Sequence, residues 1–262
     1  MRAIIAKLAT EARGGTISVS DAARALETST LAASRRLSRL AHAGWLSPVR
    51  RGLYAIRPLE AHPDVELAEE DPWVLATHAF DPCYIGGWTA AGHCGLTEQL
   101  FRRTMVVTER ALRGVRQSVG SADFYVARES RARRSGLVAV WRTNVRIWVS
   151  GIERTLVDSC AHPEWVGGGS HLIRIFRAAS HDDRLAQGAL LREARAATSG
   201  AALGRLGLLA ERFLPAHSEL LAHCRARRRS GRVRFDPAIR ENGRLITRWG
   251  IWLNIRLRDA EP

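Results

Sequence analysis

Arginine and serine recur at helical spacing in residues 29–42, and these side chains have the chemistry to contact a nucleic acid. Ser29 is a good N-cap, and in a helix that begins after it Arg35 and Arg39 lie on one face. Arginine pairs with two guanine acceptors in the DNA major groove, and shorter side chains add weaker contacts. The residues of this stretch that we expect to contact DNA are Ser29, Thr30, Leu31, Arg35, Ser38 and Arg39.

Two further arginines lie in a basic turn. Trp45-Leu46 and Leu53–Ile56 are short apolar runs typical of strands, and Ser47–Gly52 between them is the expected turn of a hairpin. In a hairpin that follows a DNA-reading helix, such a turn lies against the sugar-phosphate backbone. There Arg50 and Arg51 would position the protein without reading sequence.

Short elements must position these side chains. The apolar spacing of Ile4 to Ala12 predicts a first helix, Thr16–Val19 a short strand, and Asp21–Leu26 a second helix capped by Ser20. In the third helix Ala33, Leu37, Leu40 and Ala41 form the inner face. This order predicts a winged helix-turn-helix domain, although taken alone the third helix also fits a solvated charged surface.

The charge reverses sharply after this segment. Residues 1–57 hold ten basic and three acidic side chains, a net of +7, whereas residues 58–71 hold six acidic side chains and no basic one. We therefore predict a DNA-binding domain in 1–57, an acidic linker in 58–71 and a second domain in 72–262. An acidic linker would face away from bound DNA.

Composition narrows the class of protein. A chain of 262 residues with 46% apolar content can form real cores, and a net charge of +14 favours a polyanionic partner. The N-terminus has no apolar region of a signal peptide, and no apolar run approaches the roughly 18 residues of a membrane span. We expect a cytoplasmic protein without a membrane partner.

The second domain has the pattern of a mixed α+β fold whose C-terminal part is mostly helical. Its tryptophans are expected in the core. The predicted helices are 72–80, 152–160, 171–179, 183–197, 201–213 and 215–223, and the predicted strands are 104–107, 124–127, 137–141, 145–149 and 246–257.

Metal binding and catalysis are both weakly supported. The histidines and cysteines near Cys83 and His93 lack the ligand spacing of zinc sites. Glu153 and Asp158, five residues apart, would diverge on a helix, and Arg154 between them is expected to pair with a carboxylate. We therefore expect no metal, no cofactor and no enzymatic activity.

A second arginine cluster allows two interpretations. It is either a solvated basic loop or helix end, or a second contact with nucleic acid. An RNA-binding or nuclease-like protein that uses this cluster is thus an alternative to a DNA-binding regulator. Its members are Arg225, Arg227, Arg228, Arg229, Arg232 and Arg234.

Three stretches in order resemble the AbiEi-type antitoxin family of bacterial transcriptional regulators. The first is Gly44-Trp45-Leu46 with Arg51-Gly52-Leu53-Tyr54, which is similar to the family's wing. The second is Tyr84 to Ala91 with Gly95-Leu96-Thr97, and the third is Ser150 to Asp158, which contains Glu-Arg-Thr-Leu. Where the family often has a proline shortly before Glu-Arg-Thr, this chain has Ile152.

The resemblance implies an antitoxin that also represses its own operon through its winged helix. Its partners would be double-stranded operator DNA and a co-encoded nucleotidyltransferase-like toxin, with which a stable complex is not expected. The residues themselves favour DNA binding and say nothing about the toxin.

Overall fold

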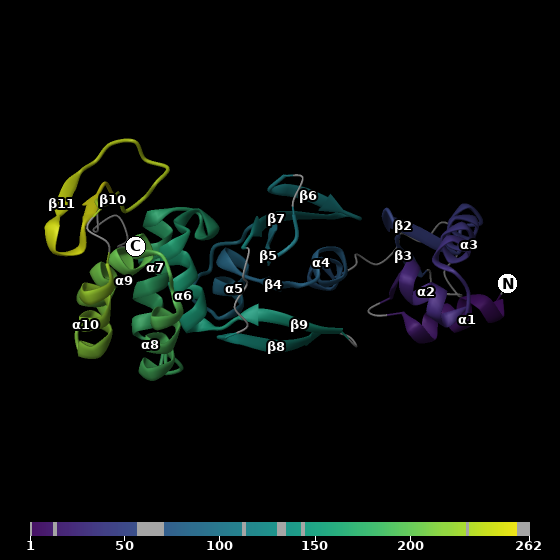
Figure 1. Ribbon diagram of the computed structural model, residues 1–262, viewed down its shortest axis with the longest axis horizontal. Helices are drawn as coiled ribbons and strands as arrows, with labels where there is room; N and C mark the ends of the chain where they lie inside the picture. The colour runs from purple at the N-terminus through teal and green to yellow at the C-terminus, as the bar shows by residue number, and fades with distance from the viewer. Residues whose placement is uncertain are drawn as a thin grey trace. The chain divides into compact units, whose positions relative to one another are not determined.

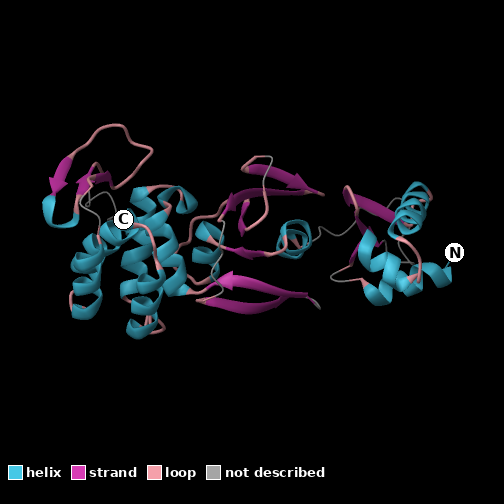
Figure 2. Ribbon diagram, in the orientation of Figure 1, coloured by secondary structure: helices cyan, strands magenta, loops and turns pink. Residues whose placement is uncertain are grey.

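The computed structural model describes residues 2–12, 15–56, 71–111, 114–129, 135–142, 145–228 and 231–255. The chain divides into two compact units. The first comprises Met1–Tyr84, Arg102–Ala132 and Ala139–Ile147, and the second comprises Ile85–Phe101, Arg133–Val138 and Trp148–Pro262. Each unit contains helices and strands, so the mixed α+β class is confirmed (Figure 2).

The N-terminal segment forms a small domain that contains the helices α1, α2 and α3 (Figure 1) and a three-stranded antiparallel sheet in the order β1-β3-β2. Ile5, Leu8, Leu37 and Leu40 are buried between the helices, and burying each such side chain contributes about 1.5–3 kcal/mol. This is the predicted winged helix-turn-helix arrangement. Its elements are α1 (Arg2–Glu11), β1 (Thr16–Ser18), α2 (Val19–Ala25), α3 (Thr30–His42), β2 (Leu46–Arg50) and β3 (Leu53–Ile56).

Two local details differ from the sequence prediction. Helix α2 is capped by Ser18, not Ser20, because Ser18 Oγ accepts the N–H of Asp21 at 3.1 Å. The turn of the wing is also shorter than expected. Strand β2 extends to Arg50, with an irregularity after Pro48, so only Arg51-Gly52 remain as the turn.

The rest of the first unit packs α4 (Pro72–Phe80) against β5 (Thr104–Thr108), β6 (Arg116–Val119) and β7 (Ala122–Arg128). Strand β7 is parallel to β5 and antiparallel to β6. The sequence did not predict β6, whose alternating side chains are mostly polar. The expected acidic linker lies outside the described residues except for Asp71, whose carboxylate caps α4 by accepting the N–H of Trp73 at 2.8 Å.

The second unit is built on a cluster of packed helices. Helix α6 contacts α8 and α9, and α10 packs on both α8 and α9 (Figure 1). A small sheet, in the order β10-β12-β11, follows. The helices are α5 (Gly87–His93), α6 (Ile152–Ala161), α7 (Gly169–Ser180), α8 (Gln187–Ala196), α9 (Gly200–Phe213) and α10 (Ser218–Arg227), and the strands are β10 (Val233–Arg234), β11 (Arg244–Ile246) and β12 (Ile251–Leu253).

Three further strands flank these elements in the chain: β4 (Cys83–Ile85), β8 (Leu137–Arg142) and β9 (Val145–Ser150). Ile85 of β4 pairs in parallel with Val149 of β9, and both residues are buried. Helix α6 begins shortly after β9 in the chain. In β9 the valines and isoleucine are buried and the residues between them are exposed, which is the period-two pattern of a strand.

The long strand predicted over residues 246–257 is wrong. Thr247–Trp249 form a 3-10 turn that ends at Gly250 with φ of 66°, and only Ile251–Leu253 continue as a strand. The alternating tryptophan and isoleucine pattern arises because the chain turns so that Trp249 and Ile251 both enter the core. Residues 256 and 257 lie outside the described residues.

The tryptophans are not uniformly core residues. Trp165 and Trp249 are buried as expected, but Trp141 is 65% exposed and Trp148 is 36% exposed. On β9, Trp148 occupies one of the outward positions between buried residues. In the described part of the chain, no helix has both the length and the apolar character that a membrane crossing requires.

Candidate nucleic-acid interface

Helix α3 presents the predicted contact residues on its outer surface. Ala33, Leu37 and Leu40 are buried against the domain core, whereas Arg35 and Arg39 are exposed and Ser38 is half-buried. The buried and the exposed side chains of α3 therefore lie on the faces that the helical spacing predicts. Leu31, one turn before Arg35, is 62% exposed, which places an apolar group beside the arginines.

The arginines of α3 have no acidic partner among the residues that the structure describes. Among the described residues, no carboxylate forms an ion pair with Arg35, Arg36 or Arg39. Arg24 on α2 differs, because its guanidinium lies 2.8 Å from a carboxylate oxygen of Asp21 and 3.5 Å from Glu11. The guanidinium groups of α3 are therefore available to phosphates or base edges.

Arg36 was missed by the sequence analysis. It is exposed and follows Arg35 directly, so it projects about 100° further around the helix. The sequence could have indicated its exposure, because Arg36 lies off the apolar face that Leu37 and Leu40 form.

The N-terminus of α3 is held by its cap. Ser29 Oγ accepts the N–H of Ala32 at 3.2 Å, so this hydroxyl caps the helix in the free protein. Thr30 and Leu31 are exposed in the first turn. In helix-turn-helix proteins this end of the recognition helix contacts base edges.

The wing places one arginine at a sharp turn. Gly52 has φ of 82°, a conformation that favours glycine, and its carbonyl accepts the N–H of Val19 at 3.0 Å. The turn is thereby tied to the start of α2, and Arg51 at its tip is exposed. Arg50 lies in β2 opposite Leu53, and its side chain lies outside the described part of the structure.

The second arginine cluster is spread over three elements. Arg225 and Arg227 lie in the last turn of α10, Arg228 is its C-cap, and Arg234 lies in β10. Arg229 lies outside the described residues, and Arg232 is exposed in the loop.

Two of these arginines have local partners. The guanidinium of Arg225 lies 3.5 Å from Glu211 and 5.4 Å from the ring centroid of Trp249, and Arg234 donates to the side chain of Asn242 at 3.0 Å. These contacts fit a structural role at least as well as nucleic-acid binding.

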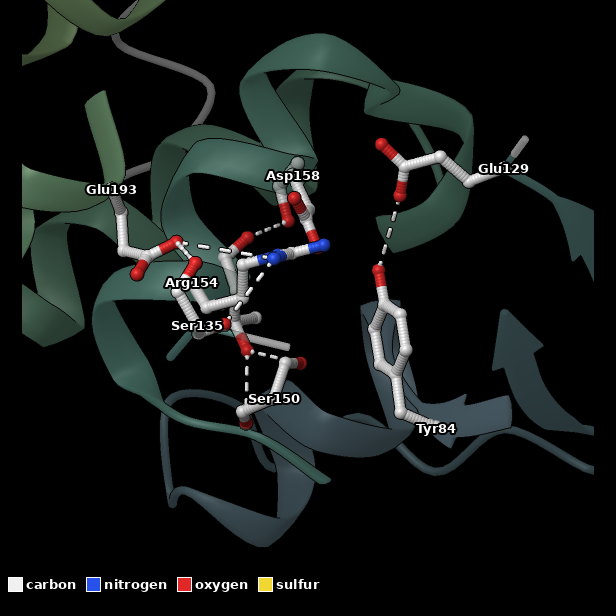
Figure 3. Close-up of polar contacts among 9 residues, drawn as sticks. Tyr84, Glu129, Ser135, Ser150, Arg154, Asp158 and Glu193 are labelled. Atoms are coloured by element: carbon white, nitrogen blue, oxygen red, sulfur yellow. Dashed lines mark hydrogen bonds and ion pairs between the residues drawn. The ribbon is translucent and has the colours of Figure 1, made fainter. Parts of the chain in front are cut away.

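A buried ion-pair network surrounds the third sequence motif (Figure 3). Arg154 Nε donates to Asp158 Oδ2 at 2.6 Å, and its Nη1 lies 3.9 Å from Glu193 Oε2. Nη1 also donates to the carbonyl of Ser135 at 3.3 Å. The arginine and both carboxylates are buried, so the expected pairing of Arg154 with a carboxylate is confirmed.

The second motif also has structural contacts. His171 is buried, and its Nδ1 faces the carbonyl of Val166, which fixes this nitrogen as the donor; Nε2 then accepts the hydroxyl of Thr97 at 2.8 Å. Phe101 stacks between Trp88 and the same imidazole. Burial lowers the pKa of His171, so the neutral form is favoured. These residues join α5 to α7.

The cysteines have the chemistry of core residues. Burial raises the pKa of the Cys83 and Cys224 thiols to about 12, and it raises that of Cys94 and Cys160 as well. Thiols in this state are poor nucleophiles and poor metal ligands. Within the described ranges, no three or more His, Cys, Asp or Glu side chains are grouped to hold a metal ion.

Comparison with known proteins links the N-terminal domain to one family. No curated protein sequence matches this chain. The crystal structure of the RV2827C protein from Mycobacterium tuberculosis has a similar fold, with a TM-score of 0.61 and 19% identity, over 95% of this chain and 89% of that chain. Residues 7–57 match the family described as "Transcriptional regulator, AbiEi antitoxin", so the resemblance of the N-terminal segment to that family is confirmed.

Proposed function

We propose that this protein is an antitoxin and a transcriptional regulator that binds operator DNA through α3 and the wing, and so represses its own operon. The carrying observation is the exposed arginine face of α3, whose guanidinium groups lack acidic partners among the described residues. The family match over residues 7–57 supports the regulatory and antitoxin roles.

In the proposed complex α3 enters the major groove with its N-terminal turns nearest the bases. Arg35 and Arg39 pair with guanine, and Leu31 lies against a thymine methyl group. Arg36 and Arg51 bind phosphates at the edges of the site and set its register. Base contacts supply the sequence specificity, and phosphate contacts supply most of the salt dependence.

Fluorescence anisotropy with labelled duplexes tests the DNA-binding part. The full chain is titrated with the promoter region of its own gene and with a scrambled duplex of equal length, at several salt concentrations. We expect tighter binding to the promoter at every salt concentration. Equal affinity for the two duplexes would rule out sequence-specific repression, and preferential binding of a single-stranded RNA of equal length would favour the alternative of an RNA-binding protein.

The antitoxin part rests on the family description of the N-terminal segment. A growth assay with the co-encoded toxin tests it in cells. We expect the full chain to restore growth, and we expect R35A/R39A to restore growth as well while losing repression of the promoter. Failure of the wild-type chain to restore growth would remove the antitoxin role and leave the regulator.

The proposal assigns no catalytic step to the chain and places its action in the cytoplasm. The carboxylates of the third motif already have partners, because Asp158 pairs with Arg154 and Glu153 accepts the N–H of Ala186 at 2.8 Å. A general acid or base needs a carboxyl group directed at a substrate. We therefore propose binding, rather than turnover, as the mode of action.

A further inference from the structure

Strand β8 has one edge that no other strand covers. Its neighbour is β9, and β8 is hydrogen-bonded to no further strand among those described (Figure 1). In the described part of the chain, no loop backbone forms a hydrogen bond with residues 137–142 either. The N–H and C=O groups along the outer edge of β8 are therefore available to a strand of another chain.

The side chains of β8 do not protect this edge. Five successive residues, Leu137–Trp141, are apolar, and none of the six residues of the strand is buried. Val138 is 54% exposed and Trp141 is 65% exposed. Edge strands of soluble proteins usually carry charged side chains, proline or a bulge, because an apolar edge pairs readily with other chains. Strand β8 thus has the composition of an interface.

Strand β6 shows how the same chain protects an edge. It is hydrogen-bonded only to β7 among the described strands, so it is also an edge strand. Its sequence begins with Arg116, Gln117 and Ser118, and only Val119 at its end is apolar and buried. The hydroxyl of Ser118 donates to Asp123 of β7 at 2.6 Å. An edge position therefore does not by itself account for the apolar sequence of β8.

The sequence of β8 is complementary to a second copy of itself. Two identical strands related by a two-fold axis pair antiparallel, and directly opposite residues lie on one face of the sheet. The axis must then pass through a residue rather than between two residues. With the axis at Ala139, every residue of Leu137–Trp141 meets an apolar residue, and the smallest side chain lies at the axis. The pairs are Leu137 with Trp141, Val138 with Val140, and Ala139 with Ala139 of the second copy.

The charge at the end of β8 selects this register over the next one. The guanidinium of Arg142 lies 4.8 Å from the ring centroid of Trp73, and its Nε lies 3.8 Å from a carboxylate oxygen of Asp71. An axis at Val140 would place Arg142 opposite Val138, where the charge loses hydration without gaining an acceptor. An axis at Ala139 leaves Arg142 outside the paired residues and in contact with its own partners.

We propose that β8 is a homodimer interface, in which two chains pair antiparallel through this strand around a two-fold axis at Ala139. Cross-strand pairs of aromatic and β-branched residues stabilise the contact. Because the interface is short, association is weak, with a Kd on the order of 10 µM. The interface uses no residue of α3, so it is independent of the proposed DNA binding.

Sedimentation equilibrium of the full chain without DNA tests the dimer. Between about 1 µM and about 300 µM protein, we expect a shift from mostly monomer to mostly dimer. Hydrogen exchange of the β8 amides should slow over the same range, whereas that of the β6 amides should not change.

A chain that stays monomeric throughout this range would overturn the proposal. A complex that forms only after addition of the co-encoded toxin would overturn the second copy as the occupant, and would assign the edge to the toxin.

Charge substitutions at the axis test the register. Ala139→Lys places two ammonium groups opposite each other and Ala139→Glu places two carboxylates there, so each variant should dimerise about tenfold more weakly than the wild type. An equimolar mixture of the two should dimerise again, because lysine then faces glutamate. Ala139 is exposed, so both variants keep the fold, and thermal unfolding of dilute protein verifies this. A mixture as monomeric as its components would overturn the axis at Ala139.

Two exposed valines provide a matched control for the position of the interface. Val138→Lys should weaken dimerisation by about tenfold, because it sets a charge opposite Val140 of the second copy. Val115 is 51% exposed, close to the value for Val138, but it lies outside β8. Val115→Lys should therefore dimerise as the wild type does. Equal dimerisation of the two lysine variants would overturn the assignment of the interface to β8.

Discussion

Arginine has opposite surroundings in the N-terminal domain and in the helical unit. On α3, Arg35 and Arg39 are exposed and lack carboxylate partners among the described residues. In the second unit Arg154 is fully buried between two carboxylates. Arg205 is buried too, and donates to three backbone carbonyls at 2.8 to 2.9 Å.

The difference shows that arginine content alone does not identify a nucleic-acid surface. A buried guanidinium needs hydrogen-bond acceptors to offset its lost hydration, so its partners are built into the fold. Burial accordingly lowers the pKa of Arg205, although the group remains charged. An exposed guanidinium keeps its hydration until a phosphate or a base replaces it, so without internal partners it remains available to an external one.

The largest effect should follow from removing the buried charge. Arg154→Met leaves Asp158 and Glu193 buried without their cation, and we expect the free energy of unfolding to fall by about 3–5 kcal/mol. Urea denaturation measures this change. Arg174→Met is the control, because Arg174 is exposed on α7 and its replacement should change stability by less than about 0.5 kcal/mol. Equal stabilities of the two variants would remove the contrast between buried and exposed arginines.

Replacing the α3 arginines should change binding and leave stability unchanged. Arg35→Ala and Arg39→Ala are each expected to cost about 1–3 kcal/mol of promoter binding per base contact. Anisotropy titrations measure the loss, and thermal unfolding checks that the fold persists. Arg24→Ala, which removes an exposed arginine already paired with Asp21, should bind the promoter as the wild type does. A comparable loss in that variant would mean that exposure alone, not the missing partner, marks the interface.

We expect the N-cap of α3 to stabilise the first turn of the helix that carries Arg35 and Arg39. Ser29→Ala is expected to destabilise α3 by about 1 kcal/mol, because the N–H of Ala32 loses its acceptor. Hydrogen exchange of the α3 amides measures the effect. Ser20→Ala serves as the comparison, since Ser18 rather than Ser20 caps α2. Similar exchange in both variants would show that the cap does not stabilise α3.

The smallest effect is expected at the wing. Arg51→Ala should weaken promoter and scrambled duplexes alike and reduce the slope of log K against log salt by about 1, as the loss of one phosphate contact predicts. Anisotropy at four or more salt concentrations gives the slope. A selective loss of promoter binding would assign Arg51 to base recognition instead.

Local patterns predicted much of the N-terminal winged helix-turn-helix domain. The spacing of Leu37 and Leu40, the cap at Ser29 and the β-branched run at Thr16 each depend on near neighbours in the chain. The same reasoning failed at Trp249, where a turn ended by Gly250 produced an alternation that imitated a strand. It also missed β6, because a strand with polar outer residues lacks the apolar signal.

The sequence by itself determined the periodicities of the first domain and the cap at Ser29, because these depend on contacts within a few residues, and it also determined the reversal of charge. It also indicated that Arg154 would pair with a carboxylate, and the structure identifies Asp158, one helical turn later, as that partner. Only the tertiary structure decided that Glu193 completes the buried network and that Arg205 donates to three backbone carbonyls. Those pairings join segments far apart in the chain, and packing, rather than local preference, brings them together.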